Sequence, residues 1–144
     1  MADELTLDNQ LCFALYVCSK EIIRIYKPLL DPLGLTYTSY ITMMALWEKD
    51  GVLVKDLGSR LFLDSGTLTP LLKKMEKEGL VKRTPSTDDE RSLIITLTDK
   101  GRAMKDKCRE IPMSVACGAK LTRENAEAIR AYLHSLMGCL KTDN

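Results

Sequence analysis

The sequence predicts a mainly helical α+β protein with one small β-hairpin. Apolar residues recur at intervals of three and four along most of the 144 residues, which is the period of a helix that buries one face. Two short runs rich in β-branched residues, 80–84 and 93–97, are separated by eight turn-forming or charged residues. The composition, 45% hydrophobic and 28% charged, together with the length, predicts one globular domain over 1–144.

The first predicted helix begins at Leu11, with Asp8 or Asn9 as its cap. It is expected to end at three helix-breaking residues, Pro28, Pro32 and Gly34. It carries two apolar rows, one of Leu11, Leu15, Cys18, Ile22, Ile25 and Leu29, the other of Cys12, Tyr16, Ile23, Tyr26 and Leu30. Because one neighbouring helix does not cover so wide a face, the pattern favours burial between partners.

Three further helices are expected before the hairpin. Thr36 is a suitable cap for the next helix, which stops near residues 50–51, and another follows over 54–63. The fourth ends at Gly79, and its start is left open by Pro70. Capping by Thr67 places the proline in the first turn, where its missing N–H costs nothing, whereas a start at residues 64–65 places it deeper in the helix.

A hairpin and two helices complete the chain. Strands at 80–84 and 93–97 flank a projecting tip. Thr98 and Asp99 cap a charged helix that is interrupted near Pro112, and Thr122 caps the last helix. That helix has a coiled-coil-like seam of Ala126, Ile129, Leu133, Leu136 and Leu140, which calls for a partner helix. A helix pair followed at once by a hairpin is the plan of a winged helix-turn-helix.

Charge is distributed unevenly along the chain. The total is only +1, so no global basic field indicates a nucleic-acid partner. Residues 65–84 nevertheless carry five basic and two acidic side chains, a local excess of +3. Facing outward on the helix before the hairpin are Ser65, Thr67, Thr69, Lys73 and Lys77, and Arg91 lies at the hairpin tip. These groups suit phosphate oxygens and base edges, although a solvated lysine-rich face is the simpler alternative.

The five cysteines do not form a metal-binding pattern. No pair has the spacing C-x-x-C, and His134 is the single histidine, so we expect neither metal nor cofactor. The acidic start of the chain is unlike a secretory signal, and no apolar run reaches the length of a membrane span. We therefore expect a cytoplasmic protein with reduced thiols and no membrane partner.

Several segments resemble the organic hydroperoxide-sensing, OhrR-type branch of the MarR family of transcriptional repressors, in its two-cysteine form. The segments are Gln10–Tyr16 (QLCFALY), Leu35–Tyr37 (LTY), Leu46–Glu48 (LWE), Leu63–Lys73 (LDSGTLTPLLK) and Asp89–Ser92 (DERS). The resemblance covers about residues 8 to 120. It departs from the family at Thr38-Ser39, where relatives often have Pro-Gln, and at Val17-Cys18, where they have two small residues.

The resemblance implies a homodimer, joined through helices at 8–33 and 112–141, with a winged helix-turn-helix core at 36–98 that binds double-stranded operator DNA. Taken with the basic region, it gives as DNA-binding residues Ser65, Thr67, Thr69, Pro70, Lys73, Lys77, Arg83 and Arg91. It also implies that such a protein is a repressor and not an enzyme.

The resemblance further implies that Cys12 is the redox sensor and an organic hydroperoxide its oxidant. Tyr26 and Tyr37 match two tyrosines that hydrogen-bond the sensor sulfur across the dimer, and Tyr16 lies one helical turn from Cys12. Cys117 matches the resolving cysteine of the family, which forms an intersubunit disulfide with the sensor. A small thiol such as glutathione is the rival resolver.

Two other functions remain open from the sequence. One is a MarR-type repressor that a small phenolic or carboxylate ligand releases, with inert cysteines. The other is a thiol peroxidase, which would need a base or an arginine near Cys12, whereas the neighbours are apolar residues and tyrosine.

Overall fold

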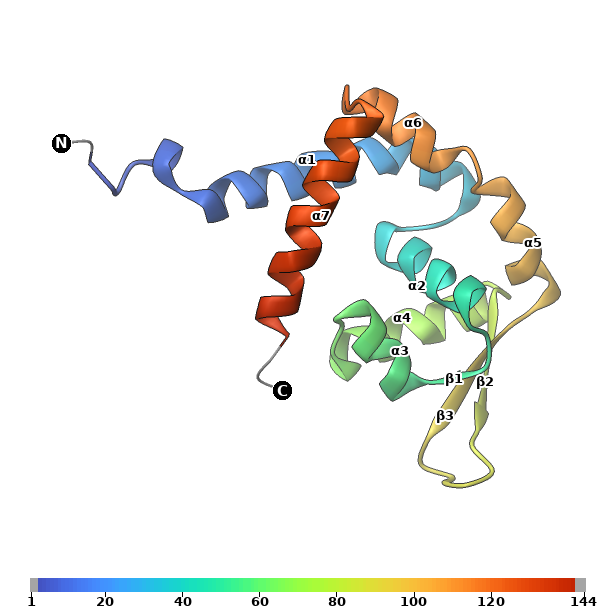
Figure 1. Cartoon of the computed structure of the whole chain (residues 1–144). Helices are drawn as coiled ribbons and strands as arrows, with labels where there is room; N and C mark the ends of the chain where they lie inside the picture. Colours follow the sequence, from blue (N-terminus) through green and yellow to red (C-terminus); the bar gives the residue numbers. More distant parts are fainter. Residues whose placement is uncertain (1–2, 142–144) are drawn as a thin grey trace. The chain divides into compact units, whose positions relative to one another are not determined.

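The computed structural model describes residues 3–141, which form two compact units. The first contains residues up to 25 and from 110 onward, and the second contains residues 26–109. Helix α1 (Leu11–Leu30) begins in the first unit, which also holds α6 (Ile111–Gly118) and α7 (Arg123–Leu140) (Figure 1). The second holds α2 (Tyr37–Glu48), α3 (Val54–Leu61), α4 (Ser65–Lys77), α5 (Asp99–Lys107) and all three strands.

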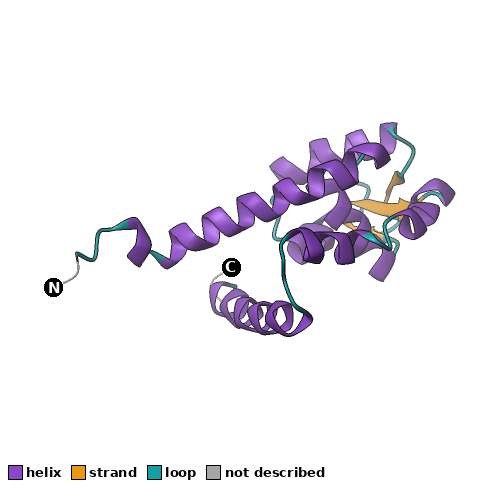
Figure 2. Cartoon of the chain, turned by 90° about the horizontal axis from the view of Figure 1, so that it is seen from above, coloured by secondary structure: helices purple, strands orange, loops and turns teal. Residues whose placement is uncertain are grey.

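The predicted fold class is confirmed, because helices dominate and the strands form one small antiparallel sheet (Figure 2). Its strand order is β1-β3-β2, from β1 (Val52–Leu53), β3 (Leu93–Leu97) and β2 (Val81–Pro85). The hairpin pairs β2 with β3 from Val81 opposite Leu97 to Pro85 opposite Leu93. Strand β1 was not expected, because a strand of two residues is too short to show an alternating pattern.

The core of the second unit lies between its helices and the sheet. Side chains from α2, α3, α4 and β3 are almost fully buried there, among them Met43, Leu46, Leu57, Leu68, Leu72, Met75 and Ile95. The predicted caps hold these elements in place. Thr36 accepts a hydrogen bond from the Ser39 N–H, and Ser39 Oγ in turn accepts one from the Thr36 N–H, forming a capping box at α2. Thr98 and Thr122 cap α5 and α7 as expected.

Two predictions about α1 are wrong. Pro28 does not end the helix but lies inside it, because an exposed site in the last turn tolerates the loss of one backbone hydrogen bond. Helix α1 ends at Leu30 and is followed by a short 3-10 turn at Asp31–Leu33. Gly34, in the left-handed conformation with φ of 70°, ends this turn. Asp8 and Asn9 do not cap α1, since both lie in a preceding 3-10 turn and the Asn9 amide donates to the Asp3 carbonyl.

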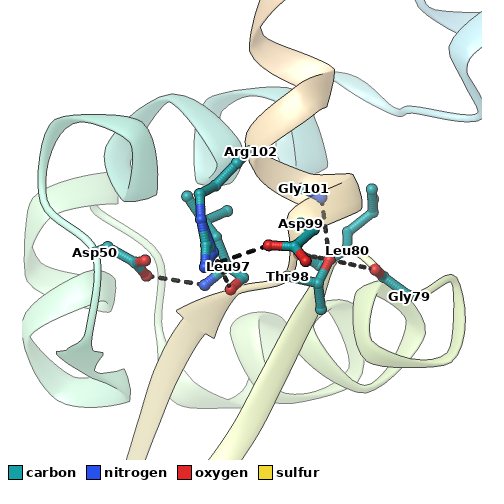
Figure 3. Close-up of polar contacts among 8 residues, drawn as sticks. All are labelled: Asp50, Gly79, Leu80, Leu97, Thr98, Asp99, Gly101 and Arg102. Atoms are coloured by element: carbon teal, nitrogen blue, oxygen red, sulfur yellow. Dashed lines mark hydrogen bonds and ion pairs between the residues drawn. The ribbon is translucent and has the colours of Figure 1, made fainter.

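Polar contacts join the end of the hairpin to the helices around it (Figure 3). The Asp50 carboxylate accepts the Leu97 N–H at 2.8 Å, and the Arg102 guanidinium donates to the Leu97 carbonyl at 3.0 Å. Thr98 Oγ1 donates to the carbonyls of Gly79 and Leu80 while it accepts the Gly101 N–H. These bonds fix the start of α5 against the loop that leads into β2.

Within residues 3–141, no helix combines the length and the apolar character that crossing a membrane requires. In the same part of the chain, no group of three or more histidine, cysteine, aspartate or glutamate side chains is placed to hold a metal ion.

Candidate functional site

Helix α4 begins at Ser65, which decides the question that Pro70 left open. The Asp64 carboxylate caps the helix by accepting the Thr67 N–H at 2.7 Å, and this hydrogen bond lowers the pKa of Asp64. Pro70 is therefore the sixth helical residue, past the N–H groups that are free in any helix. Its ring removes the hydrogen bond that would otherwise reach the Gly66 carbonyl.

The two faces of α4 differ sharply in polarity. Leu68, Leu72 and Met75 are fully buried in the second unit. Turned outward are Ser65, Thr67, Pro70, Lys73 and Lys77, all exposed, with Thr69 partly covered. Hydroxyls at the positive end of a helix followed by two lysines present donors suited to anionic oxygens and base edges. The six sequence-predicted residues of α4 therefore share one accessible face.

The turn between α3 and α4 is tight. The Leu63 N–H donates to the Gly58 carbonyl, and Phe62 takes a left-handed φ of 56°. A Cβ on Gly58 would lie 2.8 Å from the Leu63 carbonyl oxygen, closer than real side chains approach. Glycine thus allows the close crossing of the two helices that presents α4.

Arg83, the seventh predicted residue, is bound to the helix. Its Nε and Nη2 donate to Glu76 Oε1 at 3.1 and 3.0 Å, and its backbone N–H donates to Glu76 Oε2 at 2.9 Å. These donors hold the pKa of Glu76 below its usual value. Nothing in the sequence pattern identified this pair, because seven residues and a turn separate its members.

The hairpin tip is organised by an acidic residue. Asp89 accepts the Arg91 N–H at 3.0 Å through Oδ1, and its Oδ2 accepts the Ser92 hydroxyl at 3.4 Å. The Ser86 N–H donates to the Ser92 carbonyl at 2.8 Å, which closes the base of the tip. Arg91 is exposed beyond it. The acidic residues of this tip therefore include one that shapes it.

Three tyrosines of the second unit pack against one another. The ring centroids of Tyr26 and Tyr37 are 5.0 Å apart, and Tyr40 lies 5.7 Å from Tyr26 and 6.4 Å from Tyr37. Of these three, only Tyr26 and Tyr37 were predicted to belong to the site. Tyr40 lies three residues after Tyr37, a spacing that puts both on one side of α2.

Burial raises the pKa of each of these tyrosines. For Tyr26 the neighbouring Tyr37 adds to the effect. Burial, Tyr26, Cys108 and Tyr37 together raise the pKa of Tyr40 to about 12. All three phenols therefore stay protonated at neutral pH and remain able to donate hydrogen bonds.

The thiols have different environments. Cys12, Cys18 and Cys117 are exposed, whereas Cys108 is buried, and burial raises the pKa of its thiol. Tyr16 shares the exposed face of Cys12, with the Lys20 ammonium 5.6 Å from its ring centroid. Cys12, Tyr16 and Cys117 belong to the first unit, while Tyr26 and Tyr37 belong to the second.

Comparison with known proteins gives this architecture a family. Residues 24–108, more than half of the chain, match the family described as transcriptional regulator SarA/Rot. The organic hydroperoxide resistance transcriptional regulator of Bacillus subtilis (strain 168) is 44% identical over 142 residues, which cover 99% of this chain and 97% of that protein. The chain belongs to the MarR/SarA family of transcriptional regulators.

Solved MarR/SarA structures include one relative in several redox states. AbfR of Staphylococcus epidermidis, solved in its reduced form bound to DNA, matches with a TM-score of 0.79 and 36% sequence identity. The match covers 94% of this chain and 92% of the AbfR chain. Over-oxidised AbfR bound to DNA and disulfide-formed AbfR match with TM-scores of 0.75 and 0.63. A mutant MarR of E. coli with operator DNA, at 20% identity and a TM-score of 0.81 over 94% of this chain and 99% of that one, shows the shared fold.

Proposed function

We propose that this regulator is a homodimeric repressor that binds double-stranded operator DNA and releases it when an organic hydroperoxide oxidises Cys12. The observation that carries the proposal is an exposed thiol near the start of α1, in a chain 44% identical along its length to an organic hydroperoxide resistance regulator. The exposed polar face of α4 and the tip of the hairpin formed by β2 and β3, which we call the wing, supply the DNA-binding part of the proposal.

A second copy of the chain accounts for the unpaired apolar seam of α7. Ile129, Leu133, Leu136 and Leu140 remain between 36% and 74% exposed. Apolar side chains at coiled-coil spacing gain most by packing against another helix. Two copies related by a twofold axis then place two α4 helices in successive major grooves, so we expect half-sites about 10 base pairs apart, centre to centre.

The wing arginine offers a direct test of the DNA-binding mode. If Arg91 neutralises a phosphate in or beside the minor groove, Arg91→Met should weaken operator binding and flatten the plot of log affinity against log salt by about one unit. Fluorescence anisotropy of a labelled operator at several salt concentrations measures this slope. An unchanged slope would place Arg91 away from the DNA.

The proposed oxidation has two chemical steps. In the first, the Cys12 thiolate attacks one peroxide oxygen, the O–O bond breaks, and the alkoxide leaves and takes a proton to become an alcohol. The sulfur, oxidised by two electrons, is now a sulfenic acid. In the second, a Cys117 thiolate from the other subunit attacks that sulfur, an S–S bond forms as the S–O bond breaks, and the leaving hydroxide takes a proton from solvent to become water.

The geometry of the first unit supports the intersubunit partner over one in the same chain. A Cβ on Gly118 would lie 3.0 Å from Ile25 Cγ2, so the end of α6 lies against the later part of α1. Cys12 is thirteen residues before Ile25 on α1. At 1.5 Å per residue, this leaves at least about 9 Å between the Cα atoms of Cys12 and Cys117. A disulfide needs less than about 7 Å.

Non-reducing gel electrophoresis tests the disulfide. After one equivalent of cumene hydroperoxide, the wild-type protein should run as a covalent dimer that dithiothreitol reverses. Cys117→Ser should remain monomeric on the gel, because the thiol proposed to condense with the Cys12 sulfenic acid is gone. Cys18→Ser, which removes another exposed thiol of the same helix as Cys12, should still form the dimer. A dimer band in Cys117→Ser would reject Cys117 as the resolver.

Operator release tests the proposed function as a whole. Reduced wild-type protein should bind its operator, lose it after cumene hydroperoxide, and regain it after dithiothreitol. Binding that ignores peroxide and responds to a small phenol or carboxylate would favour the ligand-released repressor. Turnover of many equivalents of peroxide with a thiol donor would instead indicate a thiol peroxidase.

A further inference from the structure

The Glu76 carboxylate is the point at which the wing is fastened to α4. It accepts three hydrogen bonds from one residue of β2, two from the Arg83 guanidinium and one from the Arg83 backbone. Both side chains are partly buried, with 22% of the Arg83 and 37% of the Glu76 side chain exposed. Both guanidinium donors reach Oε1, and the backbone N–H reaches Oε2. Partial burial and three hydrogen bonds to an ionised carboxylate make such a pair stronger than a surface ion pair.

The hydrogen bond from the Arg83 backbone N–H explains why a carboxylate is suited to position 76. In the order β1-β3-β2, strand β2 is at the edge of the sheet, so one side of it lacks a neighbouring strand. The Arg83 N–H is on that side, and Glu76 Oε2 takes the place of a strand carbonyl. The same carboxylate therefore completes the hydrogen bonding of the strand and holds the guanidinium beside it.

We infer that Glu76 and Arg83 act as positioning residues that set the angle between α4 and the wing, and that Arg83 serves operator recognition through this pair and not through a phosphate. This inference rests on the proposed DNA binding. Specific recognition requires α4 and the wing tip to reach their grooves together, so loosening one against the other costs operator affinity. Binding to unrelated DNA depends mainly on charge and is affected much less.

The two possible roles of Arg83 predict opposite effects of Glu76→Gln. If the pair positions the wing, Glu76→Gln should lower operator affinity about tenfold, within the range of measured pair couplings, even though it removes a negative charge from a surface facing DNA. If Arg83 binds a phosphate instead, the substitution frees it and removes repulsion, so affinity should stay the same or rise. Glu78→Gln is the matched control, because it removes the same charge two residues away with Arg83 untouched.

The experiment measures operator and scrambled-DNA affinities by anisotropy, across a series of salt concentrations, for Glu76→Gln, Glu78→Gln, Arg83→Met and the double variant Glu76→Gln/Arg83→Met. We expect similar losses for the two single variants of the pair, little further loss in the double variant, and an unchanged salt slope. The ratio of operator to scrambled-DNA affinity should fall. A loss of folded protein would lower both affinities equally and would appear as a lower Tm.

Two results would overturn the inference while leaving the proposed function intact. One is an affinity of Glu76→Gln that equals that of Glu78→Gln. The other is a salt slope for Arg83→Met that is smaller by about one unit, as expected for a lost phosphate contact. Failure of the reduced wild-type protein to bind any operator would remove the proposed function, and the inference with it.

Discussion

Cys12→Ser is expected to bind operator as tightly as the wild-type protein and to keep it in the presence of organic hydroperoxide. Serine preserves the size of the side chain, but its oxygen is not oxidised by peroxide, so neither the sulfenic acid nor the disulfide forms. The wild-type protein should lose roughly 10- to 100-fold in operator affinity after one equivalent of cumene hydroperoxide, the usual range for coupling between two sites. Cys12→Ser should lose less than about twofold under the same treatment.

Anisotropy with a labelled operator, before and after peroxide, measures this difference. Cys18→Ser is the control for a second exposed thiol on α1, and it should respond like the wild-type protein. Release of DNA by Cys12→Ser after peroxide treatment would show that another group is the sensor.

The largest expected loss of stability follows from Gly101→Ala. A Cβ at this position would overlap the Leu80 carbonyl oxygen and lie 3.2 Å from Leu97 Cδ2. The helix is not free to move away, because the Gly101 N–H donates to Thr98 Oγ1 and the Gly101 carbonyl accepts from Trp47 Nε1 at 3.0 Å (Figure 3 shows the first of these). The overlap should lower the free energy of unfolding by about 2–4 kcal/mol.

Urea denaturation followed by circular dichroism measures this loss. Helix propensity alone predicts the opposite sign, since alanine is favoured over glycine inside a helix by about 1 kcal/mol. Gly138→Ala on α7 is the matched control: nothing lies within 4 Å of its added Cβ, so it should leave stability unchanged or slightly raised. Equal midpoints for the two variants would contradict the packing around Gly101.

The local signals in the sequence were reliable where the interaction itself is local. Thr36, Thr98 and Thr122 each bond a backbone N–H three residues ahead, so a short window of sequence contains both partners. Gly79 ends α4 as expected, with φ of 78° and the Leu80 N–H bonded to the Met75 carbonyl. The two prolines were less reliable signals. Pro28 was expected to help end α1, and Pro70 left the start of α4 open, yet both lie inside helices. A proline weakens a helix by an amount that surrounding packing can offset.

The candidate site divides in the same way. The outward residues of α4 followed from helical spacing, since burial of Leu68, Leu72 and Met75 leaves the others on the exposed face. The membership of Tyr40 in the tyrosine cluster depends on tertiary packing. Helix α2 packs against the end of α1, and this brings the Tyr26 ring beside both Tyr37 and Tyr40 of α2.

By itself the sequence determined the order of the helices, the hairpin and the exposed face of α4, and it supplied the family resemblance. Only the tertiary structure decided that Glu76 binds Arg83, that Asp50 binds the Leu97 backbone 47 residues away, and that β1 pairs with β3. The reason is physical. Periodicity and caps depend on neighbours within one or two turns, whereas the partner of a charged group or of a free strand edge is whichever complementary group folding brings beside it.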